Sequence, residues 1–99
     1  MNITSNIKND GKSALLVLEG RIDTVTAVDL EKAIAECSAA SEMVLDFEKV
    51  DYISSAGLRV ILATHKAFSS KAGLSLINVC DAILNIFEVT GFKDIINIR

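Results

Sequence analysis

The sequence predicts a single α/β domain over residues 1–99, with a mixed sheet of four to five strands packed against three to four helices. Three observations lead to this fold class. Short apolar runs alternate with segments whose apolar residues recur every three or four positions, as strands and helices do in α/β folds. The length is typical of one domain, and 51% hydrophobic residues can supply one core. An Asn-Asp-Gly turn near the N-terminus adds an antiparallel hairpin.

The first half of the chain is expected to form a hairpin, a helix and a strand. These elements are expected at Ile3–Lys8, Ala14–Glu19, Val25–Cys37 and Met43–Phe47. The second strand carries a continuous apolar block, which predicts burial on both of its faces. Asp23 or Thr24 can cap the helix. The helix pattern places Ala27, Leu30, Ile34 and Cys37 inward, and Thr26, Glu31, Lys32 and Glu36 outward.

The second half continues with a helix, a strand, a helix and a tail. The helix is expected at about Ala56–Ser69 and the strand at Leu74–Val79. Asp81 is expected to cap the last helix, and Gly91 is expected to end it. Ile95–Ile98 is expected to form an edge strand or a docked tail. The apolar stripe of the first of these helices comprises Leu58, Ile61, Leu62, His65 and Phe68, and that of the last comprises Ile83, Ile86 and Phe87.

Charge and composition exclude several classes of function. The net charge is −3 and no basic run occurs, so nucleic-acid binding is not expected. Asp81, Asn85 and Glu88 interrupt the longest apolar region, so no membrane insertion is expected. The N-terminal residues lack the features of a signal peptide, which predicts a cytoplasmic protein with Cys37 and Cys80 reduced.

Catalytic and metal-binding motifs are also missing. The chain has one histidine, His65, which is expected to be a structural residue, and its two cysteines are far apart, so we expect no metal site. Neither a phosphate-binding glycine loop nor a nucleophile elbow is present, so we expect no cofactor and no enzymatic activity.

Two strand-to-helix loops are where a sheet of this kind places a site: Gly20–Thr24 and Ile53–Leu58. The second loop contains a serine pair, Ser54 and Ser55. A serine here can serve as a helix N-cap or can accept a phosphoryl group, since the helix dipole favours negative charge at this position. Gly57 lies in the first turn, where its low helix propensity suggests close approach of another backbone.

The segment from Val44 to Leu62, which includes Ser54-Ser55-Ala56-Gly57-Leu58-Arg59, closely resembles the signature of the STAS family. The upstream Gly20-Arg21-Ile22-Asp23 is similar to a second landmark of that family. The resemblance covers nearly the whole chain and implies the family's sheet-and-helix fold. It also implies an anti-sigma factor antagonist that acts in bacterial signalling by partner switching.

In such a switch, the unphosphorylated antagonist binds an anti-sigma factor that is also a serine-protein kinase, and the sigma factor is released. The family's phosphoacceptor corresponds to Ser55, with Ser54 as second candidate because it stands where many members have aspartate. Asp23 is expected beside the acceptor. The site neighbours and partner-binding residues are expected to be Asp23, Thr24, Ser54, Ala56, Gly57 and Arg59. We expect a monomer or weak dimer. The alternative is a STAS scaffold or regulatory subunit, for example of a lipid-transport assembly, without phospho-switching.

Overall fold

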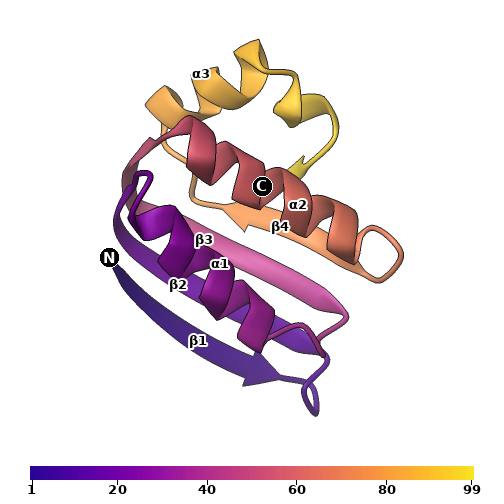
Figure 1. The fold of residues 1–99 in the computed structure, drawn as a ribbon. Helices are drawn as coiled ribbons and strands as arrows, with labels where there is room; N and C mark the ends of the chain where they lie inside the picture. The colour runs from indigo at the N-terminus through magenta and orange to yellow at the C-terminus, as the bar shows by residue number, and fades with distance from the viewer.

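Five strands form one mixed sheet in the order β1-β2-β3-β4-β5 (Figure 1). The structure is a computed structural model that describes residues 1–99. The strands are β1 (Asn2–Lys8), β2 (Ser13–Ile22), β3 (Glu42–Ile53), β4 (Gly73–Ile77) and β5 (Asn97–Ile98). Only β1 and β2 run antiparallel, and the other neighbouring strands are parallel. The hairpin turn is left-handed at Asn9 and Asp10, as an Asn-Asp-Gly turn favours.

Three α-helices cover one face of this sheet: α1 (Thr26–Glu36), α2 (Ser55–Phe68) and α3 (Asp81–Val89). Figure 1 shows α1 and α2 side by side across the strands, with α3 and a short 3-10 helix, η1 (Phe92–Asp94), beyond them. Phe87 of α3 packs edge-on against Phe47 of β3, with ring centroids 6.4 Å apart. The predicted fold class is therefore confirmed. None of the helices is both long and apolar enough to cross a membrane.

The prediction that the second strand is buried on both faces is wrong. Leu16 and Leu18 point toward the helices and are fully buried, whereas Leu15 and Val17 point to the opposite face and are half-buried. The reason is that all three helices lie on one side, so the other face is covered only by neighbouring side chains of the sheet. An apolar run is also compatible with such a half-covered strand.

β3 is much longer than the predicted Met43–Phe47. Its buried residues after Phe47 are Val50 and Ile53, which are spaced by three, and the two residues before each of them are exposed. The pairing of β3 with β2 shifts register in this region, as it does at a β-bulge. Because the shift breaks the strict alternation of a strand, periodicity did not reveal the second half of β3.

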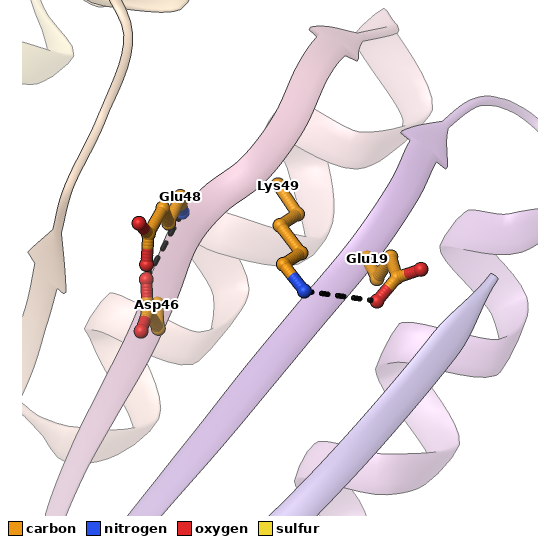
Figure 2. A network of polar contacts seen from close by, with 4 residues as sticks. All are labelled: Glu19, Asp46, Glu48 and Lys49. Atoms are coloured by element: carbon orange, nitrogen blue, oxygen red, sulfur yellow. Dashed lines mark hydrogen bonds and ion pairs between the residues drawn. The ribbon is translucent and has the colours of Figure 1, made fainter.

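Polar side chains lie on the face of the sheet opposite the helices (Figure 2). Lys49 Nζ is 3.7 Å from Glu19 Oε2 across the register shift, and both side chains are exposed. Asp46 Oδ1 accepts hydrogen bonds from the Glu48 backbone N–H and from Asn78 Nδ2, each 3.0 Å long. Exposed pairs of this kind contribute at most about 1 kcal/mol, so the helix-covered face holds most of the stabilising contacts.

The buried side of α2 differs from the predicted stripe. Its buried residues are Gly57, Val60, Ile61, Thr64 and Phe68, while Leu58, Leu62 and His65 are half-buried. Ile61 and Phe68 are therefore buried as predicted, but the helix is rotated so that Gly57, Val60 and Thr64 are buried in place of the other three stripe residues, and an apolar stripe could not indicate Gly57 or Thr64. The four residues predicted inward on α1 are all buried.

The C-terminal elements follow the prediction with two corrections. Asp81 does not cap α3: it is the first residue of the helix, and Cys80 occupies the cap position without a side-chain cap bond. β4 ends at Ile77 instead of Val79 because Asn78 adopts a left-handed conformation. Gly91 has φ 81° and ends α3 as predicted. Of the predicted apolar stripe of α3, Ile83 and Phe87 are buried and Ile86 is half-buried. The C-terminal tail forms an edge strand beside β4. Both cysteines are free thiols.

Candidate functional site

The two loops that sequence analysis singled out meet at one end of the sheet. Ile22, the last residue of β2, pairs with Ile53, the last residue of β3. The backbone N–H of Ser54 donates a 2.7 Å hydrogen bond to the carbonyl oxygen of Ile22. Asp23 and Ser54 therefore follow directly from two chain segments that are bonded to each other, and Ser55 begins α2 beside them.

The structure gives the two serines different positions. Ser54 is the N-cap of α2, and its Oγ accepts a 3.2 Å hydrogen bond from the Gly57 backbone N–H. Its side chain is half-buried. Ser55 is the first helical residue, is exposed, and its hydroxyl forms no hydrogen bond within the chain. The cap function thus belongs to Ser54, and the hydroxyl of Ser55 is free to react or to bind.

Gly57 is required by packing. A Cβ at this position would lie 2.5 Å from Cγ2 of Ile22 and 2.7 Å from Cγ1 of Ile53. The predicted close approach is confirmed, but the neighbouring groups are side chains and not a backbone. Because Gly57 has no Cβ, the first turn of α2 packs directly against the ends of β2 and β3. This packing fixes the position of Ser55 relative to the sheet.

Asp23, one of the two predicted capping residues, caps the turn that leads into α1, whereas Val25, directly before the helix, makes no side-chain cap bond. Its Oδ1 accepts hydrogen bonds from the backbone N–H groups of Val25 (3.0 Å) and Thr26 (2.9 Å). Thr26 Oγ1 accepts a 2.8 Å bond from the Asp23 N–H and donates a 2.6 Å bond to the Arg21 carbonyl. This reciprocal arrangement resembles a capping box. Thr26 was predicted to point outward, and it is instead half-buried and bonded in this loop.

Asp23 is also the carboxylate closest in sequence to this junction of loops. The pKa of its carboxyl is lowered from 3.8, chiefly by the hydrogen bond from the Thr26 backbone N–H, with additional lowering by the Thr26 hydroxyl, the Val25 N–H and the Arg21 guanidinium, and with desolvation opposing. Because the capping bonds use Oδ1, the second carboxylate oxygen remains available to a partner. The side chain is therefore ionised near neutral pH.

Exposed apolar and aromatic residues around the site were not among the predicted site residues. Val25 is 75% exposed and Val28 is 51% exposed, both on the α1 side of the junction. Tyr52 is 40% exposed, and the Arg21 guanidinium carbon lies 4.3 Å from its ring centroid. The sequence offered one indication of them: Val25 and Val28 are apolar, yet the helical pattern of α1 does not assign either residue to the core.

The remaining predicted site residues lie on the same surface. Thr24 and Arg59 are exposed, and Ala56 is half-buried. No group of three or more His, Cys, Asp or Glu side chains is placed to hold a metal ion. His65 lies on α2 about 15 Å along the helix from Ser55 at 1.5 Å per residue, so it cannot act as a base for that hydroxyl.

Comparison with known proteins gives a consistent result along nearly the whole chain. The profile of the STAS domain family matches residues 4–99. An anti-sigma-B factor antagonist of Bacillus subtilis (strain 168) is 31% identical over 100 residues, covering 99% of this chain and 92% of that protein. An anti-sigma-B factor antagonist of Listeria monocytogenes is 32% identical over 103 residues, covering 100% of this chain and 90% of that protein.

Solved structures of similar proteins have the same fold. The crystal structure of an anti-sigma factor antagonist from Mycobacterium paratuberculosis is 25% identical with a TM-score of 0.82, covering 98% of this chain and 85% of that one. SpoIIAA in its unphosphorylated form is 16% identical with a TM-score of 0.83, covering 99% and 88%. The Bacillus cell fate determinant SpoIIAA in its phosphorylated form has a TM-score of 0.76 at 16% identity, covering 99% and 91%.

Proposed function

The chain belongs to the STAS domain family, and from this membership we propose that it is an anti-sigma factor antagonist that works by partner switching. In its unphosphorylated form it binds an anti-sigma factor that is also a serine kinase, and the sigma factor is released. Phosphorylation of Ser55 prevents this binding. The relatives that match it are named as antagonists of anti-sigma factors, which supports a regulatory role, and we propose the cytoplasm as its compartment.

The observation that carries this proposal is the different placement of the two serines. Ser54 uses its hydroxyl to cap α2, whereas Ser55 exposes an unbonded hydroxyl on the first turn. In the transfer, Ser55 Oγ forms a bond to the γ-phosphorus of ATP on the kinase. The bond from that phosphorus to ADP breaks, and the hydroxyl proton leaves to the kinase or to water. SpoIIAA, which shares the fold, has been solved in both a phosphorylated and an unphosphorylated form.

The switch follows from the different effects of a phosphate on the fold and on an interface. A phosphate adds about −1.5 to −2 charges and three acceptor oxygens near neutral pH. At the N-terminus of α2 this charge is favoured by the helix dipole, so the domain loses little stability. At a packed interface the same group must be desolvated, and disruption of buried polar complementarity costs about 2–5 kcal/mol, or roughly 30- to 5,000-fold in affinity.

The test is phosphorylation by a serine-kinase anti-sigma factor from the same organism with ATP, followed by mass analysis of the peptide that contains both serines. We expect one phosphate on the parent chain and on Ser54→Ala, and none on Ser55→Ala. Stoichiometric phosphorylation of Ser55→Ala would move the acceptor to another residue, with Ser54 examined first. Ser54→Ala is the matched control because it removes the neighbouring hydroxyl.

Binding is measured separately, by titration calorimetry with the same anti-sigma factor. Ser55→Ala is expected to bind as the parent does and to resist the kinase, and Ser55→Glu is expected to bind at least 30-fold more weakly. Circular dichroism should be the same for both variants. Equal binding by Ser55→Glu and the parent would contradict the switch and favour a scaffold without phosphorylation.

A further inference from the structure

We propose that the groove between α1 and α2 receives an amphipathic helical segment of the anti-sigma factor, so that the partner's footprint extends from Ser55 along the helices and not over the open face of the sheet. This inference rests on the proposed function. It names the second surface of the interface and the chemistry of the segment that occupies it: an apolar side facing the groove, with a basic residue and an acidic residue at its edges.

The groove consists of two adjoining hollows between the helices. One has a volume of about 340 Å³ and begins at Thr24 and Ala56, and the other has a volume of about 210 Å³ and ends at Ser38 and Phe68. They share the residues Glu31, Val60 and Ala63, so they form one continuous depression. Its floor is largely apolar and a folded helix can lie between two others, as in ridges-into-grooves packing.

The near end of the groove adjoins the candidate site. Ala56 and Arg59 belong to the same first turns of α2 as Ser55, and Val28 lines the groove on the side of α1. Val28 is 51% exposed, and Val25 on the preceding turn is 75% exposed. A surface that continues from the exposed Ser55 hydroxyl onto uncovered valines gives the partner apolar area to bury, which a hydroxyl alone does not provide.

The charged residues at the edges of the groove determine in which direction the helical segment binds. Glu31 lies on the α1 side and Arg59 on the α2 side, and both are exposed. The two ion pairs of the chain, Lys49–Glu19 and Lys93–Glu88, involve neither residue. A segment with a basic side chain toward Glu31 and an acidic side chain toward Arg59 therefore meets complementary charges across the groove, which fixes its orientation.

The length of the groove sets the length of the segment. α1 has 11 residues, which span about 16 Å at 1.5 Å per residue. An occupant helix of two to three turns fits this span. The hollow beside the open face of the sheet, about 550 Å³ in volume, has only two hydrophobic residues in its lining, and its Glu19 and Lys49 side chains already pair with each other. It therefore offers an apolar helix face much less to pack against than the groove does.

The experiment uses the full chain and the serine-kinase anti-sigma factor from the same organism as the probe. A photoreactive p-benzoylphenylalanine replaces Ala67, an exposed residue at the far end of the groove, or Thr4, an exposed residue of β1 on the open face. We expect light-dependent cross-linking to the anti-sigma factor from position 67 and none from position 4. Cross-linking from position 4 alone, or from neither position while binding persists, would overturn the proposal.

A pair of arginine substitutions provides a second readout. Ala63→Arg places a long charged side chain in the middle of the groove, and Ala82→Arg makes the same change on the exposed side of α3. We expect Ala63→Arg to weaken binding at least tenfold and Ala82→Arg to leave it unchanged. If Ser55→Glu weakens binding and Ala63→Arg does not, the groove is wrong and the switch stands. If the parent chain does not bind the anti-sigma factor, both proposals fail.

Discussion

Gly57→Ala should destabilise the domain by about 2 kcal/mol, although alanine is the better helix former. The new Cβ would lie 2.5 Å from Ile22 and 2.7 Å from Ile53, well inside the usual separation of about 3.5–4.0 Å between carbon atoms. Both isoleucines are buried, at 0% and 4% exposure, so neither can move into solvent. Overpacking of this kind costs about 1–3 kcal/mol, and we take the upper end because the new Cβ clashes with two buried side chains. The higher helix propensity of alanine offsets about 1 kcal/mol of this cost, which leaves the net loss given above.

The assay is thermal and urea unfolding of Gly57→Ala beside the parent. A loss of about 2 kcal/mol corresponds to a drop in Tm of roughly 8–16 °C for a domain of this size. The shift should be accompanied by weaker partner binding, because the first turn of α2 carries both the Ser54 cap and Ser55. An unchanged or raised Tm would refute the argument from packing.

A double-mutant cycle isolates the contact with Ile53. Ile53→Ala removes Cγ1, the atom 2.7 Å from the new Cβ, so Gly57→Ala should cost at least 0.5 kcal/mol less in that background than in the parent. Gly11→Ala is the matched control, because a Cβ added at this position would have no atom within 4 Å. Its destabilisation therefore comes only from placing alanine at a φ of +87°. Its cost should be the same with and without Ile53→Ala.

The remaining predictions concern the caps, the acid limb and the core. Ser54→Ala should lose about 1 kcal/mol in urea unfolding through loss of the cap, whereas Ser55→Ala should stay within about 0.5 kcal/mol of the parent. The pKa of Asp23 is lowered on folding, so the ionised carboxylate contributes its full share of the free energy of unfolding above 3.8 and loses it as pH falls through the lower folded pKa. Asp23→Asn should keep the fold near neutral pH and should make the urea midpoint fall less steeply as the pH is lowered. An equally steep fall in both proteins would contradict this. Phe87→Ala should cost about 3–5 kcal/mol, measured by urea unfolding, because Phe87 is fully buried against Phe47.

Much of the fold could be predicted because it depends on local patterns. The hairpin turn, the inward residues of α1 and the stop at Gly91 each follow from the residues within one or two turns of chain. The second half of β3 could not be predicted, since its buried residues follow a register shift that exists only in the pairing with β2. The rotation of α2 was also hidden, because glycine and threonine occupy buried positions that an apolar stripe does not mark.

The candidate site was predictable as a place and not as a set of contacts. Two polar loops after two strands indicated the same end of the sheet, and the structure joins them through the bond from Ser54 to Ile22. Which serine caps α2 depends on one torsion: Ser54 is extended, at ψ 173°, and its hydroxyl turns back to Gly57. The sequence Ser-Ser is compatible with either assignment, since both residues have the same capping chemistry.

The sequence by itself determined the order of strands and helices, the turns, and the pair of serines at a helix start, because propensity, period and capping act between residues close along the chain. Only the tertiary structure decided which face of the sheet is covered, why position 57 excludes a side chain, and that α1 and α2 enclose a groove beside Ser55. These features arise where segments distant in sequence are packed together. Their geometry depends on distances of a few ångströms between side chains that no local pattern records.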